Sequence, residues 1–188
     1  MNYRQFKKEY FKTLRLLGLT SDQAAVSAGG SMLLYGLRRT TSDIDLDIPS
    51  ALYDRLKESG QYEVKTFAPA PYAAEHLKYA PCTELIVFNK RVDLHRAEPS
   101  VHTFMWRGIR SWSGTDVRQQ KRALGREKDQ KDIKLLALWC AGIRNFKGMT
   151  PERIEELANR QLQPRSVPIR SVGESETCLY RPGALGGF

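Results

Sequence analysis

The chain has 188 residues, of which 41% are hydrophobic and 27% charged, and its formal net charge is +9. This size and composition predict one globular domain, alone or with a small appendage. A charged N-terminal segment argues against a secretory signal, no apolar run approaches the roughly 20 residues of a membrane span, and the spacing of Cys82, Cys140 and Cys178 argues against zinc, so we expect a cytoplasmic protein with no membrane partner.

Helices and strands alternate in the first half of the chain. Phe6, Tyr10 and Leu14 recur at helical spacing, and Gly18 is placed to end that helix. Ser50 follows Pro49 and is the expected cap of a later helix. In chain order, the elements we expect are a helix over 3–17, a strand over 24–27, a helix over 31–35, a strand over 43–48 and a helix over 50–57.

The second half begins with strands and ends with helices. An Asn-Lys turn at residues 89–90 is expected to join two strands into a hairpin, and Gly108 to turn a second hairpin. Thr150 before Pro151 is a strong helix start. The expected elements are strands over 62–67, 83–89 and 91–95, a hairpin over 103–112, and helices over 116–122, 126–139 and from 150 onward.

The richest stretch for chemistry is Asp43-Ile44-Asp45-Leu46. Strand side chains alternate between faces, so Asp43 and Asp45 share one face, and Asp47 lies on it as well. Carboxylates this close repel unless a cation lies between them, and hard oxygen ligands favour Mg²⁺, which usually also contacts substrate phosphates. The aspartate pair therefore predicts a magnesium site.

A glycine-rich segment precedes these carboxylates. Gly29 and Gly30 would let a phosphate approach the backbone closely, and Ser31 would add a hydroxyl and cap the helix that follows. Alone, this segment favours a plain turn. Its spacing to the aspartates favours a phosphate site.

These motifs resemble a known signature. Gly-Gly-Ser at 29–31, an eleven-residue gap and Asp-Ile-Asp-Leu at 43–46, preceded by Arg-Arg-Thr-Thr at 38–41, resemble the nucleotidyltransferase superfamily with its polymerase-beta-like fold. Residues 125–133 are similar to a helix that follows the catalytic core in antitoxin-type and small bacterial and phage members. The resemblance extends from Ala24 to Trp139.

The resemblance implies a fold and an activity. The fold would be α/β (α+β), with a twisted mixed sheet, flanking helices and a mostly helical C-terminal part. The activity would be transfer of a nucleoside monophosphate from a triphosphate such as ATP to an acceptor, with two Mg²⁺ ions, or Mn²⁺. Asp43, Asp45 and a third carboxylate, Asp93, would be the catalytic metal ligands. Gly29, Gly30, Ser31 and Lys121 would hold the nucleotide.

Asp93 and Lys121 each have an alternative reading. Asp93 also fits a solvated strand end, while strict alternation puts His95 on the same side and gives it a site role as an alternative. Lys121 belongs to a basic segment, 107–134, that holds nine Lys or Arg and four Asp or Glu. We expect Lys121 and Arg118 to be exposed. The segment could therefore contact nucleic acid, nucleotide phosphates or only solvent.

The domain division and the acceptor follow from these observations only in part. We expect a nucleotidyltransferase domain over 1–142, a helix within 143–163 and an extended or disordered tail over 164–188. The acceptor could be tRNA or another RNA, a protein or a small molecule. Two alternatives to the transferase remain: a catalytically inactive binding protein that resembles an antitoxin, and a metal-dependent nuclease.

Overall fold

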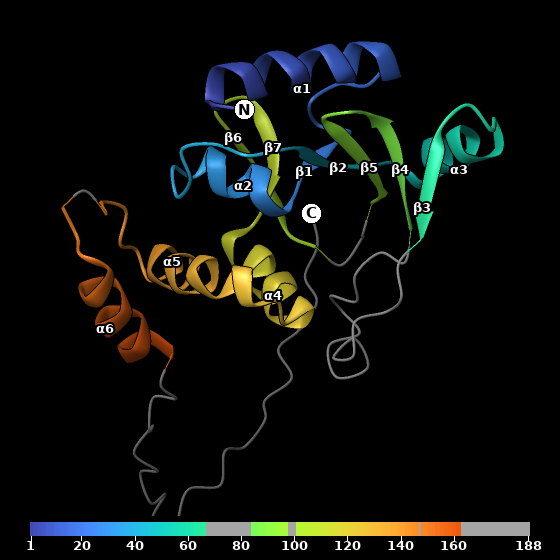
Figure 1. Cartoon of the computed structure of the whole chain (residues 1–188). Helices are drawn as coiled ribbons and strands as arrows, with labels where there is room; N and C mark the ends of the chain where they lie inside the picture. Colours follow the sequence, from blue (N-terminus) through green and yellow to red (C-terminus); the bar gives the residue numbers. More distant parts are fainter. Residues whose placement is uncertain (67–83, 98–100, 147, 163–188) are drawn as a thin grey trace, which may run out of the picture.

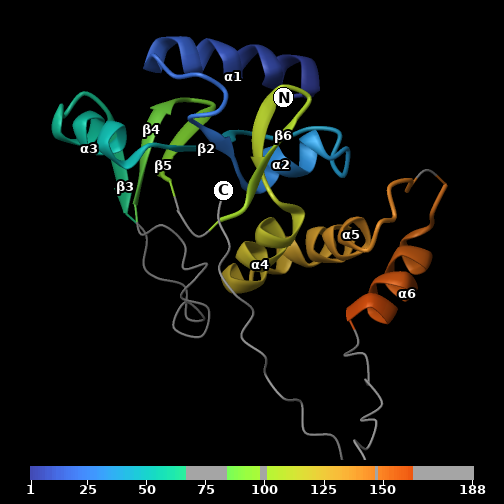
Figure 2. The same cartoon turned by 180° about the vertical axis from the view of Figure 1, so that it is seen from behind.

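The computed structural model describes residues 1–66, 84–97, 101–146 and 148–162. In this part of the chain, six α-helices flank one mixed sheet of seven strands, which confirms the expected α/β class. Figures 1 and 2 show α1 along one side of the body and α4 and α5 along the other, with α2 and the strands between them. The described helices include none that is long and apolar enough to cross a membrane.

The sheet has the order β3-β4-β5-β2-β1-β7-β6. Its two parallel pairs are β2 with β5 and β1 with β7, and the other neighbours are antiparallel. The strands are β1 (Ala25–Val26), β2 (Ile44–Ile48), β3 (Glu63–Thr66), β4 (Glu84–Asn89), β5 (Val92–Arg96), β6 (Thr103–Trp106) and β7 (Ile109–Trp112). The helices are α1 (Tyr3–Leu17), α2 (Ala28–Leu34), α3 (Ser50–Glu58), α4 (Gly114–Leu124), α5 (Gln130–Cys140) and α6 (Pro151–Leu162).

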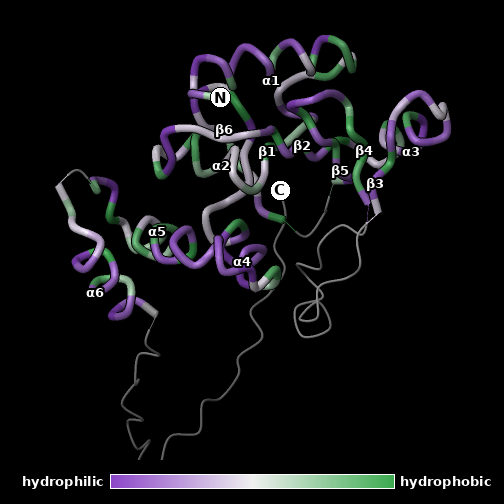
Figure 3. The backbone as a smooth tube through the Cα atoms, viewed as in Figure 1, coloured by the Kyte–Doolittle hydropathy of each residue, from purple (hydrophilic) through white to green (hydrophobic). Residues whose placement is uncertain are grey.

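Helix α1 forms as the sequence predicts. Asn2 and Gln5 make a capping box that satisfies free amides at its start, and Gly18 ends it in the left-handed conformation, with φ of 66°. Along the helix the backbone alternates between hydrophilic and hydrophobic residues (Figure 3). The apolar face, with Phe6, Tyr10 and Leu14, is buried, so α1 covers the sheet.

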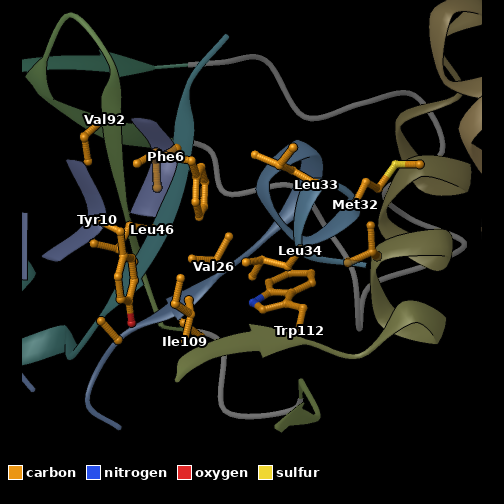
Figure 4. Close-up of a cluster of buried hydrophobic side chains, with 14 of the residues drawn as sticks. Phe6, Tyr10, Val26, Met32, Leu33, Leu34, Leu46, Val92, Ile109 and Trp112 are labelled. Atoms are coloured by element: carbon orange, nitrogen blue, oxygen red, sulfur yellow. The ribbon is translucent and has the colours of Figure 1, made fainter. Parts of the chain in front are cut away.

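The core lies between α1, α2 and the central strands (Figure 4). Phe6 and Tyr10 of α1 are fully buried, as is Leu46 of β2. From the other side, Leu34 of α2 and Trp112 of β7 complete the cluster. Burying side chains of this size stabilises a fold by about 1.5–3 kcal/mol each, so this cluster holds the strands that carry the candidate site.

The expected start of α2 and the expected cap of α3 are wrong. The helix expected at Ser31 begins at Ala28, so Gly29 and Gly30 lie in its first turn instead of in a preceding turn, and Ser31 does not cap it. The reason is that the chain leaves β1 and enters α2 directly, with Ser27 as the flanking residue. Similarly, Ser50 is the first residue of α3, and Pro49 occupies the cap position.

The C-terminal part is helical, as expected. Helices α4 and α5 are joined by a short 3-10 turn at Glu127–Asp129, and α6 packs on α5, where Lys134 pairs with Glu155 at 2.5 Å. Thr150 caps α6 as predicted, since its hydroxyl accepts a hydrogen bond from the Arg153 amide at 3.3 Å. The tail expected over 164–188 lies outside the described residues, as do the strand ends expected at 67 and 83.

The predicted aromatic hairpin is confirmed as β6 and β7, with Arg107 and Gly108 in the turn. Its side chains pack on the helical part: Tyr35 stacks on Trp139 with ring centroids 4.3 Å apart, and Trp106 donates its indole N–H to the Leu34 carbonyl at 2.7 Å. These contacts give the aromatic residues a structural role.

Candidate functional site

The carboxylates predicted to bind metal lie on neighbouring strands. Ile44, Leu46 and Ile48 of β2 are fully buried, so the alternate side chains project from the opposite face of the sheet. Asp43 and Asp45 are both partly exposed there. Because β2 and β5 are parallel and in register, Asp45 is paired directly with Asp93. The structure therefore brings Asp93 beside Asp45, as the resemblance implied.

His95 is the next side chain on this face. Its Nε2 lies 3.3 Å from Oδ1 of Asp45, and both side chains are largely buried, with 17% and 23% exposed. Strict alternation along β5 predicted that His95 shares the face of Asp93, and this contact confirms it. A histidine ring at this position can orient the Asp45 carboxylate.

Asp47 lies on the same strand face but has a different environment. Its side chain is buried, and Oδ2 accepts a hydrogen bond from the Trp112 indole N–H at 2.6 Å. Trp112 is on β7, so this bond ties β2 to the other half of the sheet. Asp47 therefore has a structural role here, and the partly exposed carboxylates are those of Asp43, Asp45 and Asp93.

The pKa of Asp93 reflects its burial and the carboxylates beside it. Burial, followed by the charge of Asp45, raises the pKa of Asp93 above its ordinary value, although His95 acts in the opposite direction. A like charge nearby disfavours ionisation, which is the signature of carboxylates sharing one site. A divalent cation between them would remove that repulsion.

The donor set fits a hard cation in its chemistry. Asp45 and Asp93 offer carboxylate oxygens from adjacent strands, and Asp43 lies just before β2, two residues from Asp45. Mg²⁺ and Mn²⁺ prefer such ligands. As these side chains are placed, no group of three or more His, Cys, Asp or Glu residues in the described ranges is arranged to hold a metal ion. The metal role of Asp43, Asp45 and Asp93 thus stays a prediction.

Helix α2 begins directly beside these carboxylates. The Ser27 amide donates to the Asp45 carbonyl at 3.0 Å, so the chain turns from β1 into α2 next to Asp45. Ala28 makes this turn with φ of 46°, a left-handed conformation that costs a non-glycine residue about 1–2 kcal/mol. The glycine-rich segment and the aspartate pair are thus brought together, as predicted from their spacing.

The members of the glycine-rich segment face different ways. A side-chain carbon on Gly29 would lie 3.1 Å from Thr41 Oγ1 and 3.4 Å from Arg38 Nη1, whereas one on Gly30 would lie 2.5 Å from Val26 Cγ1. Ser31 is fully buried and its hydroxyl donates to the Val26 carbonyl at 2.9 Å. Gly30 and Ser31 therefore hold α2 against the strands, and their predicted phosphate contacts stay untested.

Replacing Gly30 with alanine should destabilise the protein by about 1–3 kcal/mol, because the added methyl group overlaps the buried Val26 side chain. This loss exceeds the roughly 1 kcal/mol that alanine gains over glycine in a helix. Thermal unfolding measures it. Gly29→Ala, in the same turn but with looser contacts, serves as the control, and equal melting temperatures for the two variants would contradict the packing role.

Lys121 is not exposed, contrary to expectation. Only 3% of the residue is accessible, and Nζ lies 2.8 Å from Asp129 Oδ1 and 2.9 Å from Asp132 Oδ2. Burial alone would raise the pKa of Asp129, but hydrogen bonds from Arg126 and Lys121 together lower it. Arg126 also pairs with Asp129, with Nε 2.6 Å from Oδ2. The predicted nucleotide contact of Lys121 stays untested, and in this arrangement its ammonium group bonds to carboxylates.

Sequence reasoning did not assign Arg38 to the site. Its Nε lies 3.3 Å from Asp132 Oδ1, and Nη2 pairs with the other carboxylate oxygen, so the guanidinium group binds Asp132 with two nitrogens. Nη1 faces Gly29. The ion-pair cluster of Arg38, Lys121, Arg126, Asp129 and Asp132 thus connects α4 and α5 to the start of α2. The sequence signal that could have assigned Arg38 to the site is its position shortly before Asp43.

Asp93→Asn should stabilise the metal-free protein at neutral pH. Since the folded-state pKa of Asp93 is raised, its contribution to stability is present at low pH and is lost as the pH rises through that pKa. The gain should stay below about 1 kcal/mol, because solvent screens a partly exposed carboxyl group.

Melting curves in EDTA between about pH 4 and pH 7 test this, since the advantage of Asp93→Asn should grow as the pH rises from the ordinary pKa of aspartate through the raised pKa of Asp93. Mg²⁺ should raise the melting temperature of the wild type more than that of the variant. A constant difference at all pH values would contradict the raised pKa of Asp93.

A scan against protein-family models, a search of curated proteins and a search of solved structures each found no match to this chain. The resemblance to nucleotidyltransferases thus rests on the residues themselves. These are Gly29, Gly30 and Ser31 at the start of α2, Asp43 and Asp45 before and within β2, and Asp93 on β5.

Proposed function

We propose that the protein is a nucleotidyltransferase, which transfers a nucleoside monophosphate from a nucleoside triphosphate to an acceptor. The observation that supports this most is the direct pairing of Asp45 with Asp93 on parallel strands, next to the backbone hydrogen bond that places the start of α2 at Asp45. A carboxylate pair beside a glycine-rich segment suits a substrate that carries both phosphates and a divalent cation.

Five residues of the candidate site have separate roles in this proposal. Asp43, Asp45 and Asp93 would hold Mg²⁺ or Mn²⁺, which when bound would neutralise phosphate charge and lower the pKa of a bound hydroxyl. Gly29, which lies beside Thr41 and Arg38, would let a phosphate approach the backbone closely. Asp93, whose pKa is raised by burial and by Asp45, is the nearest group to accept the proton of the acceptor hydroxyl. His95 would orient Asp45.

The experiment that tests the proposal uses the full chain with each of the four nucleoside triphosphates, labelled at the α-phosphate. The protein is incubated with Mg²⁺ or Mn²⁺ and a cell extract, and the label is followed into RNA, protein and small molecules. Label carried by one of these names both the reaction and the acceptor.

Two controls separate the transferase from other reactions. A γ-phosphate label should be released as pyrophosphate, whereas γ-label retained on an acceptor would indicate phosphoryl transfer instead. Labelled RNA that becomes shorter, without transfer from any triphosphate, would contradict the proposal in favour of a nuclease. Nucleotide binding with neither outcome would indicate an inactive binding protein.

A further inference from the structure

A basic cleft lies next to the candidate site. It has a volume of about 410 Å³ and lies between residues 37–40 on one side and the start of α5, with the turn before it, on the other. Four basic side chains line it, together with one acidic, one hydroxyl and two apolar side chains: Arg38, Arg39, Lys128, Lys131, Asp132, Thr40, Leu37 and Leu135. A cleft of this size accommodates a small molecule or several phosphate groups.

Within the described part of the chain, acidic side chains balance the charge of this cleft only in part. The charge of Arg38 is matched by Asp132, to which it binds. Arg39, Lys128 and Lys131 are exposed, and within residues 1–66, 84–97, 101–146 and 148–162 none of the three forms an ion pair. Three unpaired cations around one concavity attract an anion.

Arg38 makes the cleft continuous with the candidate site. Its Nε and Nη2 bind Asp132, which is itself held by Lys121 at 2.9 Å, while Nη1 lies beside Gly29. On the same loop, the Thr41 hydroxyl donates to the Asp43 carbonyl at 3.2 Å. A guanidinium group already fixed by a carboxylate loses little conformational entropy when it binds a ligand, so Arg38 is pre-organised.

We propose that this cleft is a second phosphate-binding site, with Arg38 shared between it and the nucleotide. Guanidinium and ammonium groups are the side chains that contact phosphate most strongly. The phosphates could belong to the triphosphate or to a phosphodiester backbone in the acceptor. That identification rests on the proposed function, whereas phosphate binding in the cleft does not.

The test measures binding without catalysis. Two probes are titrated in EDTA at about 50 mM salt: sodium tripolyphosphate, followed by calorimetry, and a fluorescein-labelled single-stranded oligoribonucleotide, followed by anisotropy. The variant is Lys128→Glu/Lys131→Glu. The matched control is Lys8→Glu/Lys12→Glu on α1, which makes the same change in net charge at exposed positions. Melting curves confirm that both variants are folded.

We expect the cleft variant to bind at least one probe roughly tenfold or more weakly. The slope of the logarithm of its affinity against the logarithm of the salt concentration should fall by the equivalent of roughly one to two phosphate contacts. The α1 variant should change affinity far less. Weaker binding of tripolyphosphate alone assigns the cleft to the triphosphate, and weaker binding of the oligonucleotide alone assigns it to the acceptor backbone. Weaker binding of both shows that the cleft binds phosphate groups from either source.

Equal losses in the two variants would overturn the proposal, because net charge would then account for binding. Unchanged affinity of the cleft variant for both probes would overturn it as well. Failure of the transferase assay leaves this result intact, since no metal ion or turnover is involved in the titrations.

Discussion

Asp45→Asn should lower nucleotidyl transfer by about three orders of magnitude or more. A divalent cation supplies several kcal/mol of charge stabilisation in such a reaction, and each 1.4 kcal/mol is about a tenfold change in rate. Asp45 is paired with Asp93 and contacts His95, so this change removes the carboxylate that links the two strands of the candidate site. The fold should persist, because asparagine has the same shape and removes a charge that opposes Asp93.

The label-transfer assay measures this effect, with circular dichroism to confirm folding. Asp22→Asn is the matched control: it makes the same chemical change at an exposed position in the turn before β1. Because Ala25 is paired with Asp47, this turn lies toward the opposite end of β2 from Asp43. Full turnover by Asp45→Asn would show that the carboxylate pair does not hold the catalytic cation.

Lys121→Met should destabilise the protein by about 3–5 kcal/mol, the usual cost of removing one partner from a buried ion pair. The variant would leave Asp129 and Asp132, which are 1% and 5% exposed, without the ammonium group that both contact. Methionine fills a similar volume, so the loss reports the charge. Urea unfolding at pH 7 measures the free energy of unfolding directly.

Lys128→Met is the control for this prediction, since Lys128 is exposed and its replacement should stay within about 0.5 kcal/mol. Acid provides a second readout. The folded-state pKa of Asp129 is lowered, so its contribution to stability is present above the ordinary pKa of aspartate and is lost as the pH falls through the folded-state value. If the two variants unfold at the same urea concentration, Lys121 contributes no more than a surface lysine.

Local signals in the sequence were sufficient for most of the fold. Helix α1 and the start of α6 follow from capping residues and from apolar spacing, both of which act within a few residues. The start of α2 could not be predicted in the same way. Its backbone depends on the left-handed Ala28 and on the close packing of Gly30 against Val26, which are properties of the assembled sheet.

In the candidate site, too, only the features that depend on neighbouring residues could be predicted from local sequence. Alternation along β2 was enough to put Asp43 and Asp45 on one face, whereas the position of Asp93 beside them was implied by the resemblance. The burial of Lys121 could not be read from its basic neighbours. It depends on Asp132, whose other partner, Arg38, lies 94 residues away in the sequence. Contacts across such distances leave no local pattern.

The pairing of β2 with β5 also determines when the site can form during folding. Asp45 and His95, which touch in the finished protein, are separated by 50 residues, and a loop of this length must close before they meet. Contacts of this range form more slowly than local helices. A nascent chain that has only reached β3 therefore carries the glycine-rich segment with half of the carboxylate pair, and it gains a complete site only when β5 has been synthesised and inserted beside β2.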